Sequence, residues 1–215
     1  MDRAIRWGGV PAILGGLLFP AAALLHPAGE DLTSVLSSNW RLAHLLGWLS
    51  LMLLHLGLVA IYARQAPRTG WLGLSGFVLA FVGGAFAAAI QFLAATAVPL
   101  VAEQAPNLFE QVTTPPAFAP AVLVGGLVLG HVLFGIATFR AAVFPRWSGA
   151  LLAIGVVMFF AGEVSFLGDR FALESLRPTF ETMRQLRPVV ILGDFAFGLS
   201  LAWMGLFLLR SRDTR

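Results

Sequence analysis

The stretch Leu42–Tyr62 reads LAHLLGWLSLMLLHLGLVAIY, and it decides the fold class of the chain. It has 21 residues and no Asp, Glu, Lys or Arg. As a helix rising 1.5 Å per residue it is roughly 32 Å long, which matches a bilayer hydrocarbon core of about 30 Å. We therefore predict that this stretch is a transmembrane helix.

Five further apolar runs resemble it, and Pro and Gly residues mark most of their ends. The six predicted spans are 8–26, 42–62, 71–100, 119–139, 148–167 and 189–209. The first run is interpreted as a retained span, because no convincing cleavage site for a secretory signal follows it. The whole chain is 58% hydrophobic and 12% charged, more apolar than a soluble domain of 215 residues can bury. We predict an all-α fold, a polytopic membrane helical bundle of six spans forming a single integral membrane domain (1–215).

The arginines are unevenly divided between the two sides of this arrangement. One side has Arg3, Arg6, Arg64, Arg68, Arg140, Arg146, Arg210, Arg212 and Arg215; the other has Arg41, Arg170, Arg177, Arg184 and Arg187. Because cytoplasmic flanks collect arginine, we expect both termini on the cytoplasmic side of a bacterial-type inner membrane. The apolar spacing around Phe171 and Phe180 predicts an amphipathic helix on the outer surface.

The composition also excludes several kinds of function. The chain has no cysteine, so thiolate metal sites, iron–sulfur clusters and disulfides are excluded. All 14 basic residues are arginine, and they lie at span ends and not in a patch, so no nucleic-acid partner is expected. The expected partners are the lipid bilayer and other membrane subunits. No phosphate-binding loop, serine-hydrolase motif or dinucleotide motif occurs, and enzyme activity is not expected.

A weak internal repeat relates the predicted spans. His55, Arg64, Trp71 and Gly73 have the same spacing as His131, Arg140, Trp147 and Gly149, and Trp7 and Gly9 match the Trp-x-Gly part. In the last span the residue nine positions before Arg210 is Leu201 instead of His. One interpretation is three copies of a two-helix hairpin. The alternative is that Arg and Trp gather at membrane interfaces without any duplication.

Ionisable groups inside a bilayer are costly, so each is a candidate functional residue. His55 and His131 both lie nine residues before the Arg that ends their span, and we expect them at one depth. Such a pair suits axial ligation of a b-type haem, interhelical hydrogen bonding, or a ligand or proton path. Hydrogen bonding is the favoured interpretation.

A second layer is predicted near the outer boundary. It comprises His26, His44, Gln91, Glu163 and Asp194. These groups suit ion pairing, a ligand or proton pocket, or a divalent cation, although no metal-binding motif supports the last. Trp40, His44, Trp48, Leu51 and His55 follow helical spacing, so one face of the second span connects both layers.

Three function classes fit these features. The favoured one is a small accessory or ligand-binding membrane subunit with an outer polar pocket and an intramembrane His pair. The second is a redox protein that binds b-type haem or quinone. The third is a proton-coupled small-molecule transporter.

Overall fold

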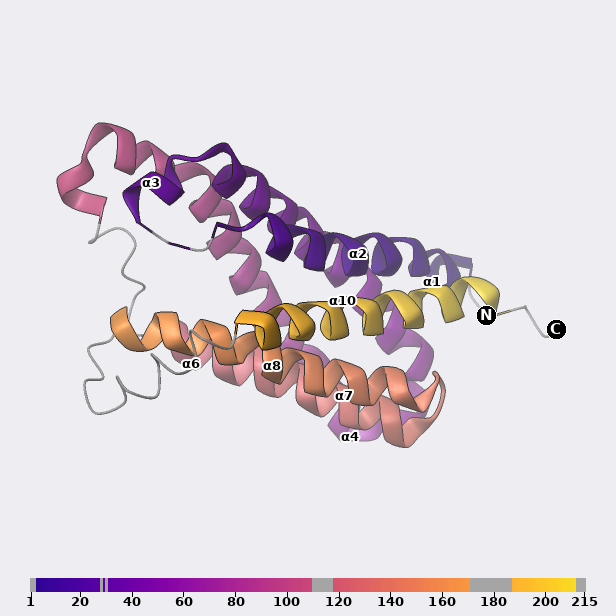
Figure 1. Ribbon diagram of the computed structural model, residues 1–215. Coiled ribbons are helices and arrows are strands. Elements are labelled where there is room, and N and C mark those ends of the chain that lie inside the picture. Colours follow the sequence, from indigo (N-terminus) through magenta and orange to yellow (C-terminus); the bar gives the residue numbers. More distant parts are fainter. Residues whose placement is uncertain (1–2, 28, 30, 110–117, 171–186, 212–215) are drawn as a thin grey trace.

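The computed structural model describes residues 3–27, 29, 31–109, 118–170 and 187–211, without the side chains of residues 120 and 161–170. Helices account for almost all of this part of the chain (Figure 1). They are α1 (Arg3–Trp7), α2 (Gly9–Leu25), α3 (Leu32–Val35), α4 (Ser38–Gln104), η1 (Pro106–Leu108), α6 (Ala119–Val122), the π-helix η2 (Leu123–Val128), α7 (Leu129–Ala141), α8 (Arg146–Arg170) and α10 (Arg187–Arg210). The predicted all-α class is confirmed for the described residues. The amphipathic helix expected near Phe171 and Phe180 lies outside them.

Four helical segments of the described chain are long and apolar enough to cross a membrane. They are Arg3–Leu25, Ser38–Gln104, Leu123–Ala141 and Arg187–Arg210. These bounds overlap the predicted spans 8–26, 119–139 and 189–209, while predicted spans 42–62 and 71–100 both fall within Ser38–Gln104.

Helix α4 is a hairpin of two antiparallel arms. At Gly70 the backbone leaves helical geometry, with φ 54° and ψ −151°, a conformation that an L side chain rarely adopts. Side chains on either side of this break then meet: the Tyr62 and Phe77 rings stack at 4.4 Å, and Trp48 and Phe92 lie 5.6 Å apart. The first arm (38–69) and the second arm (71–104) therefore run in opposite directions, as Figure 1 shows.

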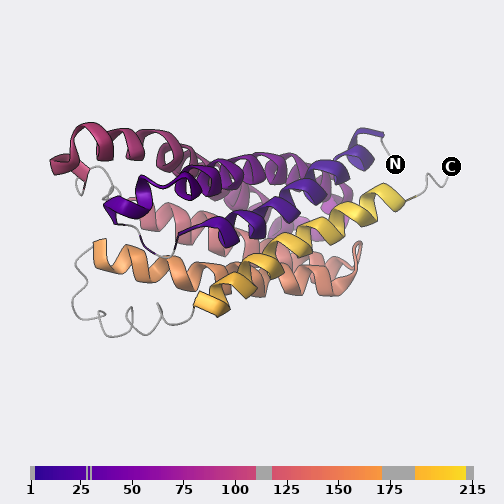
Figure 2. The same cartoon turned by 45° about the horizontal axis from the view of Figure 1, so that its top comes forward.

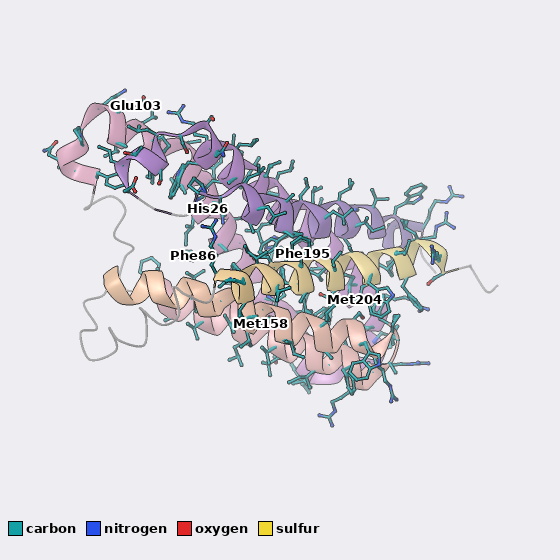
Figure 3. The ribbon with its side chains drawn as sticks, in the orientation of Figure 1. His26, Phe86, Glu103, Met158, Phe195 and Met204 are labelled. Carbon is teal, nitrogen blue, oxygen red and sulfur yellow. The ribbon has the colours of Figure 1, made fainter. Side chains whose placement is uncertain are left out.

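The long helices form a ring that follows chain order. Helix α2 packs against α4 and α10, α10 against α8, α8 against α7, and α7 against α4. Contacts at Gly57 place α2 on the first arm of α4, and contacts at Gly76 place α7 on the second arm. Both chain ends lie at one end of this bundle, called the termini end below (Figure 2). His26 and Glu103 lie toward the opposite end (Figure 3).

Small residues allow these helices to approach closely. A Cβ added at Gly135 would lie 2.5 Å from the Gly149 carbonyl oxygen, and one added at Gly155 would lie 2.5 Å from the Phe197 nitrogen. Larger apolar side chains point outward instead, such as Leu56, which is 62% exposed, and Leu192, which is 60% exposed. Glycine seams inside and leucine outside are typical of helices that associate in lipid, where close contact drives packing.

Candidate functional site

Three aromatic rings meet near the end of the bundle opposite the termini. His26 follows the last residue of α2, while Trp40 and His44 lie one turn apart in the first arm of α4. The ring centroids are separated by 4.9 Å for His26–His44, 5.1 Å for His26–Trp40 and 4.2 Å for Trp40–His44. We call these three residues the histidine–tryptophan cluster. Trp40 and His44 are buried, and His26 is partly exposed.

Backbone carbonyls hold each ring of the cluster in place. The Trp40 Nε1–H donates to the Ala94 oxygen at 2.8 Å, which ties the first arm of α4 to the second. His44 Nδ1 lies 2.9 Å from the Trp40 oxygen, and His26 Nδ1 lies 2.8 Å from the Pro27 oxygen. Since a carbonyl only accepts, both Nδ1 atoms carry the proton in these hydrogen bonds. In the neutral rings each Nε2 is then a hydrogen-bond acceptor.

The remaining residues of the predicted outer layer have different relations to this cluster. Gln91, in the second arm, packs over Gly47, one turn from His44, where an added Cβ would lie 3.2 Å from the Gln91 amide oxygen. Arg187 begins α10 and donates to the His26 carbonyl oxygen at 3.1 Å. Asp194 is buried on α10 at 4% exposure. The side chain of Glu163 is outside those described, so its predicted place in the layer is not tested.

Burial sets the charge of His26, which lies beyond the end of α2. Loss of hydration lowers the pKa of the His26 imidazole, and the nearby Arg187 guanidinium lowers it further, against the hydrogen bond to Pro27. The neutral ring is therefore favoured near pH 7. Among the described side chains, no group of three His, Asp or Glu is placed to hold a metal ion.

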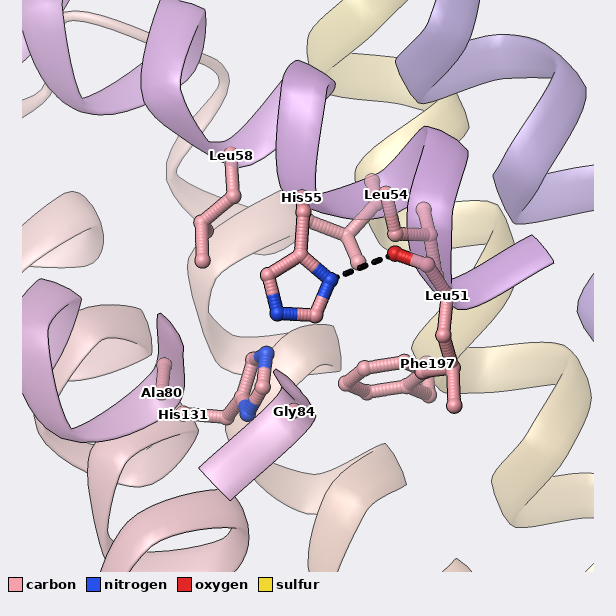
Figure 4. A pocket seen from close by; sticks show the side chains of 9 residues that line it. Leu51, Leu54, His55, Leu58, Ala80, Gly84, His131 and Phe197 are labelled. Carbon is pink, nitrogen blue, oxygen red and sulfur yellow. Dashed lines mark hydrogen bonds between the residues drawn. The ribbon is translucent and has the colours of Figure 1, made fainter. Parts of the chain in front are cut away.

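A second site lies in the middle of the ring of helices. His55 and His131 point toward each other into one cavity, together with Phe197 (Figure 4). The cavity measures about 10 Å³, which is the space of about one water molecule. His131 Nδ1 lies 2.7 Å from the Leu127 oxygen, one turn back in its own helix. The structure thus brings together the two histidines that the sequence placed at one depth.

The surroundings of His55 do not fit a haem. Its Nδ1 lies 2.6 Å from the Leu51 oxygen and its Nε2 lies 3.0 Å from the Phe81 oxygen on the second arm of α4. A Cβ added at Gly84 would lie 2.9 Å from the His55 ring, so this arm packs directly on the imidazole. A macrocycle has no room between the rings, and Nε2 faces a carbonyl instead of open space. Hydrogen bonding between the two arms, the favoured interpretation from the sequence, fits these contacts.

The predicted repeat positions coincide at this cavity. His55, His131 and Leu201 each lie nine residues before an arginine, and all three line it. Two of the three Trp-x-Gly glycines contact another helix closely, Gly9 at Gly205 and Gly149 at Gly135, whereas Gly73 faces the Thr69 side chain of its own helix. Interfacial gathering of Trp and Arg does not account for glycine at such close contacts. Because Gly73 differs, the three-hairpin interpretation stays a prediction.

One buried polar contact was not predicted from the sequence. Gln65 is fully buried, and its Nε2 donates to Thr138 Oγ1 at 2.9 Å, which links the first arm of α4 to α7. Its Oε1 has no hydrogen-bond partner among the described residues. Gln65 lies beyond the predicted span 42–62, and its sequence position gave no sign that its side chain would be buried.

No known family model matches the chain, and no curated protein or solved structure has significant similarity to it. The functional argument therefore depends on the geometry described above.

Proposed function

We propose that this chain is a six-span inner-membrane protein with both termini in the cytoplasm. The doubling back of α4 at Gly70 supports two spans within that helix, each arm being over 30 residues long. Helix α8 has 25 residues and packs between α7 and α10, which supports it as the fifth span. The arginine excess at the termini end supports the orientation. Outward-facing leucines such as Leu56 and Leu192 supply the lipid-facing surface.

Within that membrane protein, the proposed task is binding of a small ligand at the outer histidine–tryptophan cluster, as a ligand-binding or accessory subunit. The mutual contact of His26, Trp40 and His44 is the observation that carries this proposal. Two neighbouring imidazoles with their Nδ1 atoms already bonded present two Nε2 acceptors to one ligand. Packing alone does not require two imidazoles at this point.

The chemistry of the cluster selects a class of ligand. Neutral imidazoles accept hydrogen bonds, and the Trp40 ring offers a flat apolar face. Burial of Trp40 and His44 disfavours a ligand with a full charge. The fitting ligand is therefore an uncharged, membrane-soluble molecule with hydrogen-bond-donating hydroxyls, of which a quinol is the natural probe.

Binding of decylubiquinol to the purified protein in lipid nanodiscs tests this proposal, with tryptophan fluorescence as the signal. Saturable quenching is expected, and the oxidised decylubiquinone, which has no hydroxyl to donate, binds more weakly. The variant His44→Phe keeps a ring but removes one acceptor. Because one hydrogen bond contributes about 0.5–1.5 kcal/mol, affinity falls roughly two- to twelvefold.

Two tryptophan variants locate the signal. Trp40→Phe removes most of the quenching, while Trp203→Phe, which replaces a half-exposed ring on α10, leaves it in place. If binding is saturable but His44→Phe does not weaken it, the ligand binds elsewhere and the proposed site is wrong. If neither quinol nor quinone binds, the quinol class is wrong and the cluster is assigned to helix packing.

Of the two other function classes, only the quinone part of the redox class agrees with the proposed ligand. The haem hypothesis does not fit the packing at His55. The proton-coupled transporter hypothesis stays a prediction, since it depends on Glu163 as well as Asp194.

A further inference from the structure

A groove at the termini end lies between the reversal of α4 and the end of α7. It measures about 380 Å³, within the range of roughly 300–1,000 Å³ typical of small-ligand sites. The segment from Arg68 to Leu72 forms one wall, and Ala137 and Arg140 form the other. Two arginines that are far apart in the sequence therefore face one open groove.

Within the described part of the chain, neither arginine of this groove has an acidic partner. Arg68 and Arg140 are exposed and make no ion pair within the described residues. The ion pair that the described side chains form, Arg41 with Glu103, is at the other end of the bundle. At the termini end, many of the described side chains end in nitrogen atoms (Figure 3).

The rest of the lining combines polar and apolar groups in one short segment. Thr69 brings a hydroxyl to the groove, and Gly70 has open space where a side chain would stand. Trp71 follows at 82% exposure, and Leu72 and Ala137 add apolar surface. Exposed tryptophan beside arginine is typical of the level of lipid headgroups. Guanidinium groups bind phosphate oxygens through paired N–H donors.

We propose that this groove binds the phosphate headgroup of an anionic phospholipid from the cytoplasmic leaflet. Arg68 and Arg140 hold the phosphate between them, and the first part of an acyl chain lies along Trp71 and Leu72. Basic pockets between helices on the cytoplasmic side are a known form of lipid recognition. The site is separate from the outer histidine–tryptophan cluster and does not depend on its ligand.

Microscale thermophoresis of the full chain in neutral detergent measures this binding, with dihexanoyl phosphatidylglycerol as the probe. Dihexanoyl phosphatidylcholine and inorganic phosphate are titrated in parallel. The double variant Arg68→Gln/Arg140→Gln is compared with Arg146→Gln/Arg210→Gln, which removes the same charge from exposed sites at the same end. A basic residue near an anionic surface contributes about 1 kcal/mol, so the groove variant weakens phosphatidylglycerol binding roughly thirtyfold.

The control variant distinguishes a site from a general charge effect. Equal weakening in both double variants means that binding follows net charge alone, and it overturns the proposal. Binding of inorganic phosphate as tight as that of phosphatidylglycerol overturns the lipid assignment and identifies a soluble phosphate ligand. Equal binding of phosphatidylcholine also overturns it, because the groove then makes no use of the anionic charge. Arg68→Lys/Arg140→Lys, which keeps the charge but loses the paired donors, is expected to fall between wild type and the Gln variant.

Discussion

The contact between Gln65 and Thr138 gives a quantitative test of the packing between α4 and α7. The Gln65 amide is fully buried, its Nε2 donates to Thr138 Oγ1, and its Oε1 accepts from no donor among the described residues. Thr138→Val keeps the side-chain shape but removes that acceptor. An unsatisfied buried group costs about 1–3 kcal/mol, while hydrogen bonds between membrane helices average about 0.6 and reach about 1.7 kcal/mol. We therefore expect Thr138→Val to lower the free energy of unfolding by about 1–2 kcal/mol.

The same reasoning predicts that Gln65→Leu does not destabilise the protein. This change loses one hydrogen bond of about 1 kcal/mol, but it also removes the unpaired Oε1, which costs about 1–3 kcal/mol. The result is a protein that is unchanged or more stable by up to about 2 kcal/mol. In the Gln65→Leu background, Thr138→Val no longer leaves an amide without a partner, so it costs close to nothing. The coupling between the two positions is then about 1–2 kcal/mol.

Thermal unfolding of the wild type, the two single variants and the double variant in detergent measures this coupling, with the fluorescence of the 6 tryptophans as the signal. For a chain of this size, 1 kcal/mol corresponds to about 2–4 °C in Tm, so Thr138→Val lowers Tm by roughly 2–8 °C. Gln65→Leu is expected to leave Tm unchanged or raise it. Equal costs of Thr138→Val in the two backgrounds would refute the reasoning. So would a Gln65→Leu variant less stable than Thr138→Val, because Gln65 Oε1 would then have a partner that the packing does not supply.

Two further predictions concern the helix seams and the outer cluster. A Cβ at Gly198 would collide with the Gly16 carbonyl oxygen, so Gly198→Ala is expected to lower the free energy of unfolding by about 1–3 kcal/mol through overpacking. The control Gly125→Ala, at a position with open space for a Cβ, is expected not to lower Tm. For His26, burial lowers the pKa of the folded imidazole below its ordinary value near 6.5, so the unfolded chain binds more protons as the pH falls. The stability that depends on the neutral His26 ring is fully present above pH 6.5, and it is lost as the pH falls from there toward the lower pKa of the folded protein. A Tm profile from pH 8 to 5 should therefore fall in wild type and fall less in His26→Gln; parallel profiles would contradict this assignment.

The sequence predicted much of the site geometry through spacing along helices. His55 and His131 were placed at one depth because each lies nine residues before an arginine, and both line the central cavity. His26 and His44 were placed in one outer layer, and their rings are 4.9 Å apart. Depth follows from residue number at 1.5 Å per residue, so these relations are available without coordinates.

Rotation about the helix axis is the quantity that spacing does not supply. The haem hypothesis does not fit the contacts there: His55 Nε2 faces the Phe81 carbonyl, and only the position of the second arm of α4 shows this. Gln65 was missed for the same reason, since its burial depends on Thr138 of another helix. The groove joins Arg68 and Arg140, which the sequence had not linked to each other.

The sequence by itself determined that this protein is helical, apolar over long runs, and basic at one end. Those properties are sums over residues, and they hold whatever the packing. The tertiary structure decided which polar groups meet, because helices apolar on all sides carry little information about which face points inward. Close glycine contacts, such as Gly135 with Gly149, fix those rotations through steric fit. The histidine–tryptophan cluster, the central cavity and the arginine groove are consequences of that fit.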